Sequence, residues 1–343
     1  MRGKRGENAV KGEEFKDDFR KALPPEVVQR LQRRSPWRAT AAVLHDFAVI
    51  AVAVSVALAY WPNVLIIFLA ILVIGTRQHA LFVIAHDAAH YLLYQRRWLN
   101  DAVGRACAAL QGLSMCTYRV IHRMHHNNLY GALDPDTALH GGYPRGKNYL
   151  LRKLLKDLSG LTAWKTYAYF LGGAPAPNTQ TNVALRPLDD TSEKLRREAR
   201  SDRNAVIVFH IAALVIFAWS GYLVEYLVLW VLPLVTVVQA ILRLRAIAEH
   251  GATTDFSSPL TAARTNLAPA WLEWLIFPHH VNYHIEHHLY ASVPHYRLRE
   301  LHRQMVARGV LEGAEVVPFR ATLGKIFADP VRGGAASSAL TKA

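Results

Sequence analysis

Three clusters of histidines have the spacing of metal ligands on a helix. Asn282-Tyr-His-Ile-Glu-His-His288 places imidazoles at positions i, i+3 and i+4, and His122-Arg-Met-His-His126 repeats this spacing. His86-Asp-Ala-Ala-His90 places two imidazoles at i and i+4. Side chains three or four residues apart are neighbours on a helix, so each cluster can present its rings together. One such pair is weak evidence, but three clusters in one chain predict a metal site built from imidazole.

The number of histidines indicates more than one metal ion. His250, at the end of the last long apolar segment, adds a ninth imidazole to the eight in the clusters. A tetrahedral zinc takes three or four such ligands, whereas nine fit two metals of octahedral habit with positions left open. Two metals beside a membrane favour a redox pair that activates oxygen, for which iron is the usual ion, although the composition does not exclude other metals. The predicted ligands are His86, His90, His122, His125, His126, His250, His284, His287 and His288.

Apolar segments of the length of membrane spans must position these clusters. Hydrophobic residues make up 52% of the 343-residue chain, and several long runs carry no charge. This pattern is typical of an integral membrane protein. Spans are predicted at about 39–60, 62–80, 205–220 and 223–243. The predicted fold is therefore all-α and membrane-embedded, with four transmembrane helices in two hairpins and a cytoplasmic helical cap that carries the histidine clusters.

The distribution of basic residues predicts the orientation in the membrane. No Lys or Arg occurs between Ala39 and Gly75 or between Asn204 and Leu242, so all 40 lie in three segments that four spans place on one side. The positive-inside rule makes that side cytoplasmic. The net charge of +14 is then a topology signal, with anionic lipid headgroups rather than nucleic acid as neighbours. We expect a multi-pass protein of a bacterial inner membrane, with both termini and the metal site cytoplasmic.

The rise of a helix brings the clusters to one level. If the second span begins near Trp61 and crosses in about 20 residues, its continuation holds His86 and His90 roughly 9 and 15 Å beyond the membrane core. The same rise places His250 about 10 Å beyond it. Arg243 and Arg245 are expected to anchor that helix at the headgroups. A slot between spans two and four is expected to hold a long apolar substrate below the metals.

The remaining organisation follows from composition. The predicted parts are a basic cytoplasmic segment at 1–38, a membrane-bound domain at 39–332 and a disordered tail at 333–343. Residues 101–118 are apolar but short, and we expect one interfacial or re-entrant helix there. The charged start of the chain predicts no secretory signal peptide. Cys107 and Cys116 are expected to be reduced and structural.

Polar residues among the ligands are predicted to act from outside the metal shell. A carboxylate can accept the second N–H of a ligating imidazole and so fix its tautomer. Glu249 points about 100° away from His250 on a helix, so we expect His250 to bind metal and Glu249 to support it. The predicted supporting residues are Asp87, Asp134, Asp136, Glu249, Asn282 and Glu286.

The other histidines are predicted to lie outside the ligand set. His79 is expected to cap or hydrogen-bond locally, and His279 and His280 to support the third cluster at most. His45 and His210 lie in spans and are expected to be packed and hydrogen-bonded. Surface positions are predicted for His140, His295 and His302.

The three clusters, in this order and with a two-span hairpin before the third, resemble the membrane-bound fatty acid desaturase and hydroxylase family. The segment Asn282-Tyr-His-Ile-Glu-His-His-Leu-Tyr-Ala-Ser-Val-Pro-His295 is especially similar to bacterial and acyl-lipid desaturases. Arg245-Ala-Ile-Ala-Glu-His250 and Asp134-Pro-Asp136 are also similar. The resemblance covers about residues 40–305. Ala291 stands where many relatives have proline, which affects a loop rather than a ligand.

This resemblance implies a non-haem di-iron centre that uses O2 and two externally supplied electrons on a lipid or fatty acyl substrate. It implies an electron donor such as ferredoxin or cytochrome b5; no His-Pro-Gly-Gly motif occurs, so no fused cytochrome b5 domain is expected. Acyl desaturation is the leading prediction, and a hydroxylase or ketolase acting on a fatty acyl or carotenoid substrate is the alternative. A metal transporter is a distant alternative, because transporters place polar ligands near the bilayer midplane and these spans carry almost none.

Overall fold

The computed structural model describes residues 22–173, 177, 182, 186–189 and 191–330, which are mainly helical. Four stretches are long and apolar enough to cross a membrane: Pro36–Ala59, Val64–Ala89, Glu193–Trp219 and Leu223–His250. They confirm the predicted spans as candidate membrane-spanning helices. The expected tail at 333–343 and residues 1–21 of the basic N-terminal segment lie outside the described residues.

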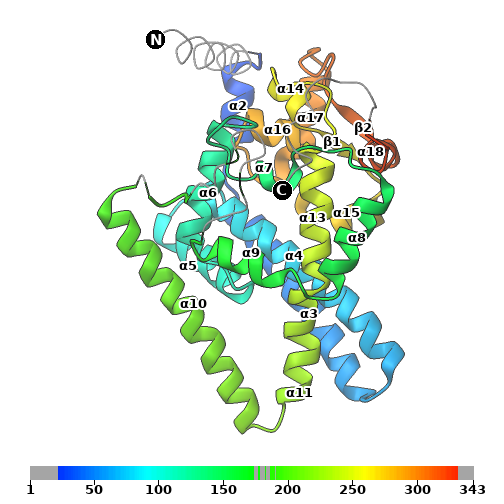
Figure 1. Cartoon of the computed structure of the whole chain (residues 1–343). Coiled ribbons are helices and arrows are strands. Elements are labelled where there is room, and N and C mark those ends of the chain that lie inside the picture. The colour runs from blue at the N-terminus through cyan, green and yellow to red at the C-terminus, as the bar shows by residue number, and fades with distance from the viewer. Residues whose placement is uncertain (1–21, 174–176, 178–181, 183–185, 190, 331–343) are drawn as a thin grey trace.

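The first two candidate spans, α3 (Pro36–Ala59) and α4 (Val64–Ala89), pack against each other (Figure 1). Asn63 starts α4 by accepting the backbone N–H groups of Leu65 and Ile66, at 3.1 and 3.2 Å. Such a cap satisfies N–H groups that have no partner in the first turn of a helix. From Ile74 to its end α4 is buried, so its second half is a core element that carries the first histidine cluster.

The third and fourth candidate spans differ in detail from the prediction. The third, α10 (Glu193–Trp219), begins twelve residues before the predicted position 205, because a polar first half precedes its apolar run. The fourth consists of α11 (Leu223–Tyr226), a π-helical turn η1 (Leu227–Val231), α12 (Leu232–Val235) and α13 (Val237–His250). Pro233 has no N–H to donate, which accounts for the widened turn that precedes it.

Shorter elements gather at one end of the molecule, and the long helices extend from the other (Figure 1). The shorter α-helices are α2 (Pro25–Leu31), α5 (Arg97–Leu110), α6 (Met115–Asn127), α7 (Thr137–His140), α8 (Lys147–Leu158), α9 (Ala163–Phe170), α14 (Pro259–Ala262), α15 (Ala270–Ile276), α16 (His284–Leu289), α17 (Leu298–Val306) and α18 (Phe319–Ile326). Two 3-10 turns, η2 (Pro278–His280) and η3 (His295–Arg297), flank α16. The single helix predicted at 101–118 was wrong. Gly112, with φ +74°, makes a left-handed turn that separates α5 from α6.

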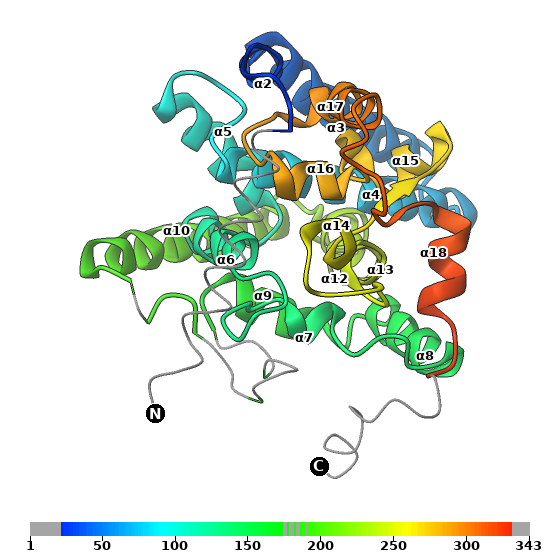
Figure 2. The same cartoon turned by 90° about the horizontal axis from the view of Figure 1, so that it is seen from above.

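Two short parallel strands fix the third histidine cluster. β1 (Thr265–Leu267) pairs with β2 (Val316–Pro318), with Thr265 opposite Val316. Thr265 also accepts the backbone N–H of Ile285 in α16, at 3.3 Å. Seen from above, α6, α13 and α16 lie around the middle of the molecule (Figure 2). The strands therefore tie α16 to the part of the chain that follows α13.

The second and fourth candidate spans are in direct contact. A Cβ atom at Gly75 of α4 would lie 2.6 Å from the Cβ of Val237 in α13, closer than real side chains approach. Glycine is therefore required at this crossing. The expected substrate slot between spans two and four is closed at this level, because the two backbones meet there.

Gly75→Ala is expected to destabilise the protein. The overpacked methyl group costs about 1–3 kcal/mol, which exceeds the gain of about 1 kcal/mol from replacing glycine in a helix. Gly324→Ala in α18 is the matched control, since nothing lies within 4 Å of its Cβ position. Thermal unfolding of the detergent-solubilised protein should show a lower midpoint for Gly75→Ala and an unchanged or higher one for Gly324→Ala. Equal midpoints for both variants would contradict the close contact.

Candidate metal centre

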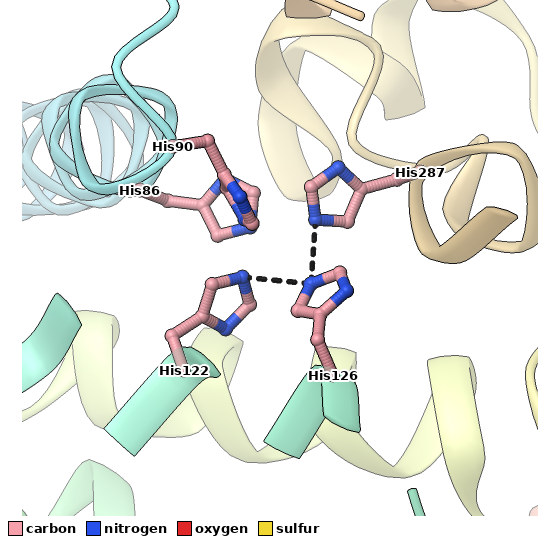
Figure 3. Close-up of side chains that lie close together, drawn as sticks. All are labelled: His86, His90, His122, His126 and His287. Atoms are coloured by element: carbon pink, nitrogen blue, oxygen red, sulfur yellow. Dashed lines mark hydrogen bonds between the residues drawn. The ribbon is translucent and has the colours of Figure 1, made fainter. Parts of the chain in front are cut away.

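All nine predicted ligand histidines come together, and they form two groups. Within each group the candidate ligand atoms lie within 4.8 Å of one another. The first histidine group consists of His86, His90, His122, His126 and His287 (Figure 3). The second histidine group consists of His125, His250, His284 and His288. The first group offers five candidate ligand nitrogens and the second offers four. Together they are more than one tetrahedral metal ion binds.

Helical geometry divides each three-histidine cluster between the groups. On α6, His122 and His126 belong to the first group, whereas His125 belongs to the second. Positions i and i+4 are only about 40° apart around a helix, while i+3 lies about 100° from i+4. On α16 the division is reversed, with only His287 in the first group. The expectation that all three rings of a cluster face the same site was wrong, because α6 and α16 each contribute histidines to both groups.

The Nε2 atoms within each group face one another at short distances. That of His126 lies 3.0 Å from those of both His122 and His287. In the second group, such distances run from 2.7 to 3.2 Å. At a metal–nitrogen distance of about 2.1 Å, two ligands at right angles are about 3.0 Å apart and two tetrahedral ligands about 3.4 Å apart. The spacing therefore fits the right angles of an octahedral metal better than a tetrahedral zinc.

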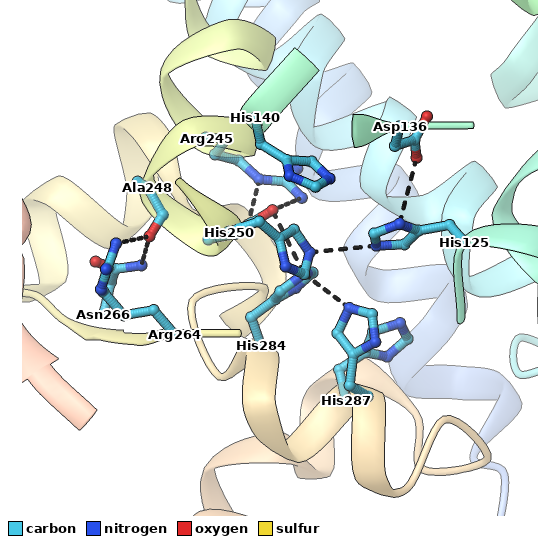
Figure 4. A network of polar contacts seen from close by, with 12 residues as sticks. His125, Asp136, His140, Arg245, Ala248, His250, Arg264, Asn266, His284 and His287 are labelled. Atoms are coloured by element: carbon cyan, nitrogen blue, oxygen red, sulfur yellow. Dashed lines mark hydrogen bonds and ion pairs between the residues drawn. The ribbon is translucent and has the colours of Figure 1, made fainter. Parts of the chain in front are cut away.

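Partners at Nδ1 orient two rings of the second group. His125 donates from Nδ1 to Asp134 at 3.0 Å, and His250 donates from Nδ1 to the carbonyl of Ala262 at 3.2 Å. Their Nε2 atoms then point at each other, 3.2 Å apart (Figure 4). Two lone pairs at this distance require a cation between them, either a second proton on His125 or a metal ion. A carboxylate behind a ligating imidazole is a recurrent device for fixing its tautomer.

Burial keeps most of these imidazoles in the neutral form that binds metal. Loss of solvation, reinforced by neighbouring imidazoles, holds the pKa values well below the usual range for His122, His126, His284, His287 and His288. Burial also lowers the pKa of His90 to about 3. His125 differs: burial opposes its charge, but Asp134 and Asp136 outweigh burial and raise its pKa to about 9. A metal ion that binds His125 must therefore displace a proton.

A buried nitrogen without a partner fits metal binding as well. Nε2 of His90 is buried and makes no hydrogen bond within the described part of the chain. Leaving such a group unsatisfied costs about 1–3 kcal/mol. Coordination would recover this cost. The donor set therefore fits two metal ions.

Four of the six predicted supporting residues lie beside the ligands. Asp87 lies 3.5 Å from Nδ1 of His86, and Asp134 contacts His125 as described. Asp136 lies 3.9 Å from Nδ1 of His125. A carboxylate oxygen of Glu249 lies 3.8 Å from Nε2 of His284.

Arg245 determines how Glu249 is held. It donates two hydrogen bonds to the Glu249 carboxylate, at 2.7 and 3.1 Å, and its third nitrogen lies 3.1 Å from His79. The predictions that Arg245 anchors at the headgroups and that His79 bonds locally were wrong, because both side chains are buried between α4 and α13. Arg243 donates a hydrogen bond to Asp157 of α8 at 3.0 Å.

Asn282 and Glu286 have structural partners instead of ligand imidazoles. The amide of Asn282 donates to the backbone carbonyl of Asn266 at 3.0 Å. Glu286 accepts a hydrogen bond from Thr265 at 2.5 Å and pairs with His302 of α17. These contacts join α16 to β1 and α17, so the two residues orient the helix that bears the ligands.

Two histidines predicted at the surface are buried. His295 is 4% exposed, and its Nδ1 lies 2.7 Å from Asp87. His140 is 1% exposed, and its ring centre lies 4.8 Å from that of His250 (Figure 4). Both sit in segments that fold back over the clusters, which helical periodicity does not reveal. His210 is hydrogen-bonded as expected, to the carbonyl of Ala109 at 2.8 Å. His279 contacts Asp46 of α3 at 2.7 Å.

Arg264 and Asn266 are positioning residues that the sequence did not reveal. Arg264 donates to the carbonyls of Ala248 and Gly251, each at 3.0 Å, and Asn266 donates to Ala248 at 3.1 Å (Figure 4). These bonds satisfy the free carbonyls at the end of α13 and thereby fix His250. Their only signal in the sequence is a charged and an amide residue in a short extended segment.

The described part of the chain is mainly helical, with four stretches long and apolar enough to cross a membrane and two largely buried groups of histidines that could hold metal ions. Residues 62–318 match the family described as fatty acid desaturase, and the chain belongs to this family. The family consists of oxidoreductases and is generally iron-dependent, so the chain is a desaturase-family oxidoreductase. The resemblance drawn from the histidine clusters is thereby confirmed.

The relatives are distant in sequence, and two of the three matches described here cover most of both chains. A dihydrorhizobitoxine desaturase of Bradyrhizobium elkanii is 25% identical over 269 residues, covering 75% of this chain and 72% of the relative. A probable fatty acid desaturase of Sorghum bicolor is 24% identical over 300 residues, covering 82% of this chain and 73% of the relative. An sn-1 oleoyl-lipid 12-desaturase of Anabaena variabilis is 33% identical over 127 residues, covering 36% and 33%.

Asp134→Asn is expected to weaken metal binding at the second histidine group. Asp134 accepts the backbone N–H of Tyr130 at one oxygen and that of Asp136 at the other, both at 2.9 Å. An asparagine keeps only one of these acceptor oxygens, and it no longer carries the charge that favours the Nδ1–H tautomer of His125. Loss of such a support lowers metal affinity by about 10–100-fold. Metal titration of chelator-treated protein should show one weakened and one unchanged site. Asp255→Asn, in an exposed loop, is the control, and equal affinities in both variants would refute the role of Asp134.

Proposed function

We propose that this chain is a di-iron enzyme that oxidises unactivated C–H bonds of a lipid chain with O2, most simply by acyl desaturation. The observation that carries the proposal is the division of nine histidines into two adjacent groups with right-angled spacing. Neutral nitrogen ligands and octahedral habit suit iron. Desaturation removes two hydrogens from the substrate, while O2, two electrons from a donor and two protons yield two waters. Bound iron would supply the oxidising power for that removal.

The chain's own residues would hold and shield this chemistry. Asp134 and the carbonyl of Ala262 keep the rings of His125 and His250 turned inward. Asp87, which bonds to His295 at 2.7 Å, ties the end of α4 to the segment after α16. The ligands are buried or partly buried, which limits access of bulk water to reactive species.

The names of the relatives support a proposal for the substrate class and the electron donor. Most are named as fatty acid or acyl-lipid desaturases, and one, of Helianthus annuus, is named as ferredoxin-dependent. We propose a lipid or fatty acyl substrate and an external donor such as ferredoxin or cytochrome b5 for this chain.

We propose that the four spans form two hairpins with the histidine groups in a cytoplasmic cap, in a bacterial inner membrane. The segments that hold all 40 basic residues support this orientation, because four spans place them on one side. The membrane-bound domain would extend from 39 to 332.

Expression in a host with simple lipids tests the function. Mass spectrometry of the lipid extract should show a new product two mass units lighter than a host acyl chain. His287→Ala, which removes one ligand of the first group, should abolish the product while the protein still inserts. A product with an added hydroxyl or keto group would replace desaturation by hydroxylation or ketolation. An unchanged lipid profile with iron-loaded protein and a working donor would refute lipid oxidation.

Cysteine labelling tests the orientation. Val64 and Ser220 are exposed next to the inter-helix turns, and Arg152 is exposed on α8. The native Cys107 and Cys116 are buried and give little background. Cysteines at positions 64 and 220 should react with an impermeant maleimide added to whole cells, whereas one at 152 should react only after lysis. The reverse pattern would refute the four-span topology.

A further inference from the structure

The α8–α9 elbow, formed by these two helices and the turn between them, exposes a row of large apolar side chains. On α8, Leu151, Leu155 and Leu158 lie within about 60° of one another around the helix, and all three are exposed. The row continues beyond α8 through Leu161 and Trp164, which are 70% and 65% exposed. An exposed apolar row of this kind is typical of a surface that another body covers.

The other two faces of α8 show how the leucine row is oriented. Leu150 and Leu154, each about 100° from the leucine that follows, pack with Ile247 of α13, and α8 lies beside α13 (Figure 1). Arg152 and Lys156, each about 100° from the leucine that precedes, are exposed. The leucine row therefore lies between a face that packs on the protein and a basic face. This order is typical of helices that enter a membrane surface.

Contacts with the fourth candidate span place the turn of the elbow at the depth of the bilayer. A Cβ atom at Gly160 would lie 3.6 Å from Cγ2 of Val235, and the hydroxyl of Tyr167 donates to the carbonyl of Leu234 at 3.1 Å. Val235 precedes Arg243, the first basic residue after the apolar run, by eight residues, roughly 12 Å along the span. The turn therefore lies beside the uncharged part of a candidate span, and lipid is the medium around that part.

The charge of the elbow favours an anionic lipid surface. The elbow contains five Lys or Arg residues and a single acidic residue, Asp157, which is buried and accepts a hydrogen bond from Arg243 at 3.0 Å. Arg152, Lys156 and Lys165 are exposed, and none of them forms an ion pair within the described part of the chain. Cations beside an apolar face extend to the headgroup level and attract anionic lipids. A second copy of this chain would bring the same positive charge, and like charges oppose such a contact.

We infer that the α8–α9 elbow inserts its leucine row into the leaflet on the side of the histidine groups, and that its exposed cations bind anionic headgroups. Because α8 packs along α13, which ends at His250, the elbow connects this leaflet to the second histidine group. The elbow is not one of the four candidate spans, so the inference adds a membrane contact to them. It rests on the proposed membrane location and is independent of the proposed reaction.

Fluorescence quenching in vesicles tests the insertion. Leu158→Cys and Lys156→Cys place a nitrobenzoxadiazole label on opposite faces of α8, about 160° apart. The native Cys107 and Cys116 are buried and give little background. A spin-labelled phosphatidylcholine quenches from within the bilayer, and iodide quenches from water. The lipid should quench the label at 158 at least about fivefold more than the label at 156, and iodide should reverse this order.

Headgroup selection is tested with the spin label on phosphatidylglycerol at the same mole fraction. Phosphatidylglycerol should quench the label at 158 more strongly than phosphatidylcholine, because each nearby cation favours an anionic lipid by about fivefold. Lys156→Gln together with Lys165→Gln should lower this preference at least about fivefold. Arg320→Gln, which removes an exposed cation from α18, is the control and should leave the preference unchanged.

Three results would overturn the inference. Iodide quenching at 158 as strong as at 156 shows that water covers the leucine row. Protection of the label at 158 from both quenchers shows that protein covers it. Equal quenching by the two lipids removes anionic headgroups from the site. The variants leave both histidine groups intact and should keep the iron content of the wild type, so failure here is separate from failure of the proposed function.

Discussion

The structure depends on holding nine imidazole nitrogens close together in a buried space. Nε2 atoms only 2.7 to 3.2 Å apart cannot all carry lone pairs toward one another without a cation. Burial makes the charged forms of most of these rings costly, so protons on the imidazoles are a poor solution. Metal ions would supply the required positive charge to several rings at once. The rest of the fold keeps these nitrogens from moving apart.

Several elements share this task, and each acts at a different distance from the ligands. Asp134 fixes the tautomer of His125 directly. Arg264 and Asn266 hold the end of α13, and Thr265 ties α16 to β1. The contact of Gly75 with Val237 sets the separation of α4 and α13, which bring two sets of ligands to the same level. Metal binding at these groups would therefore depend on helix packing, since a shift of either helix changes the distances between nitrogens.

Sequence reasoning identified the nine histidines that come together, because the spacing that marks them is local. The spacing within His122-Arg-Met-His-His126 and the apolar length of α4 both follow from helix geometry, and both were confirmed. What it missed depends on contacts between distant segments. His295 and His140 are buried because the chain folds back over α4 and α13. Arg245 is buried because its guanidinium forms hydrogen bonds with Glu249 and with His79, which lies on another helix. The division of each cluster between two groups also needs the relative placement of α6 and α16.

The most direct test of this account is anomalous diffraction at the iron absorption edge from crystals of the purified, iron-loaded protein. The account predicts two separate iron peaks, one surrounded by the first histidine group and one by the second. The ring of His125 should face the second peak through Nε2, with Asp134 behind it. A single peak, or a peak at the Asp134 and His140 side of His125 in place of either group, would contradict it.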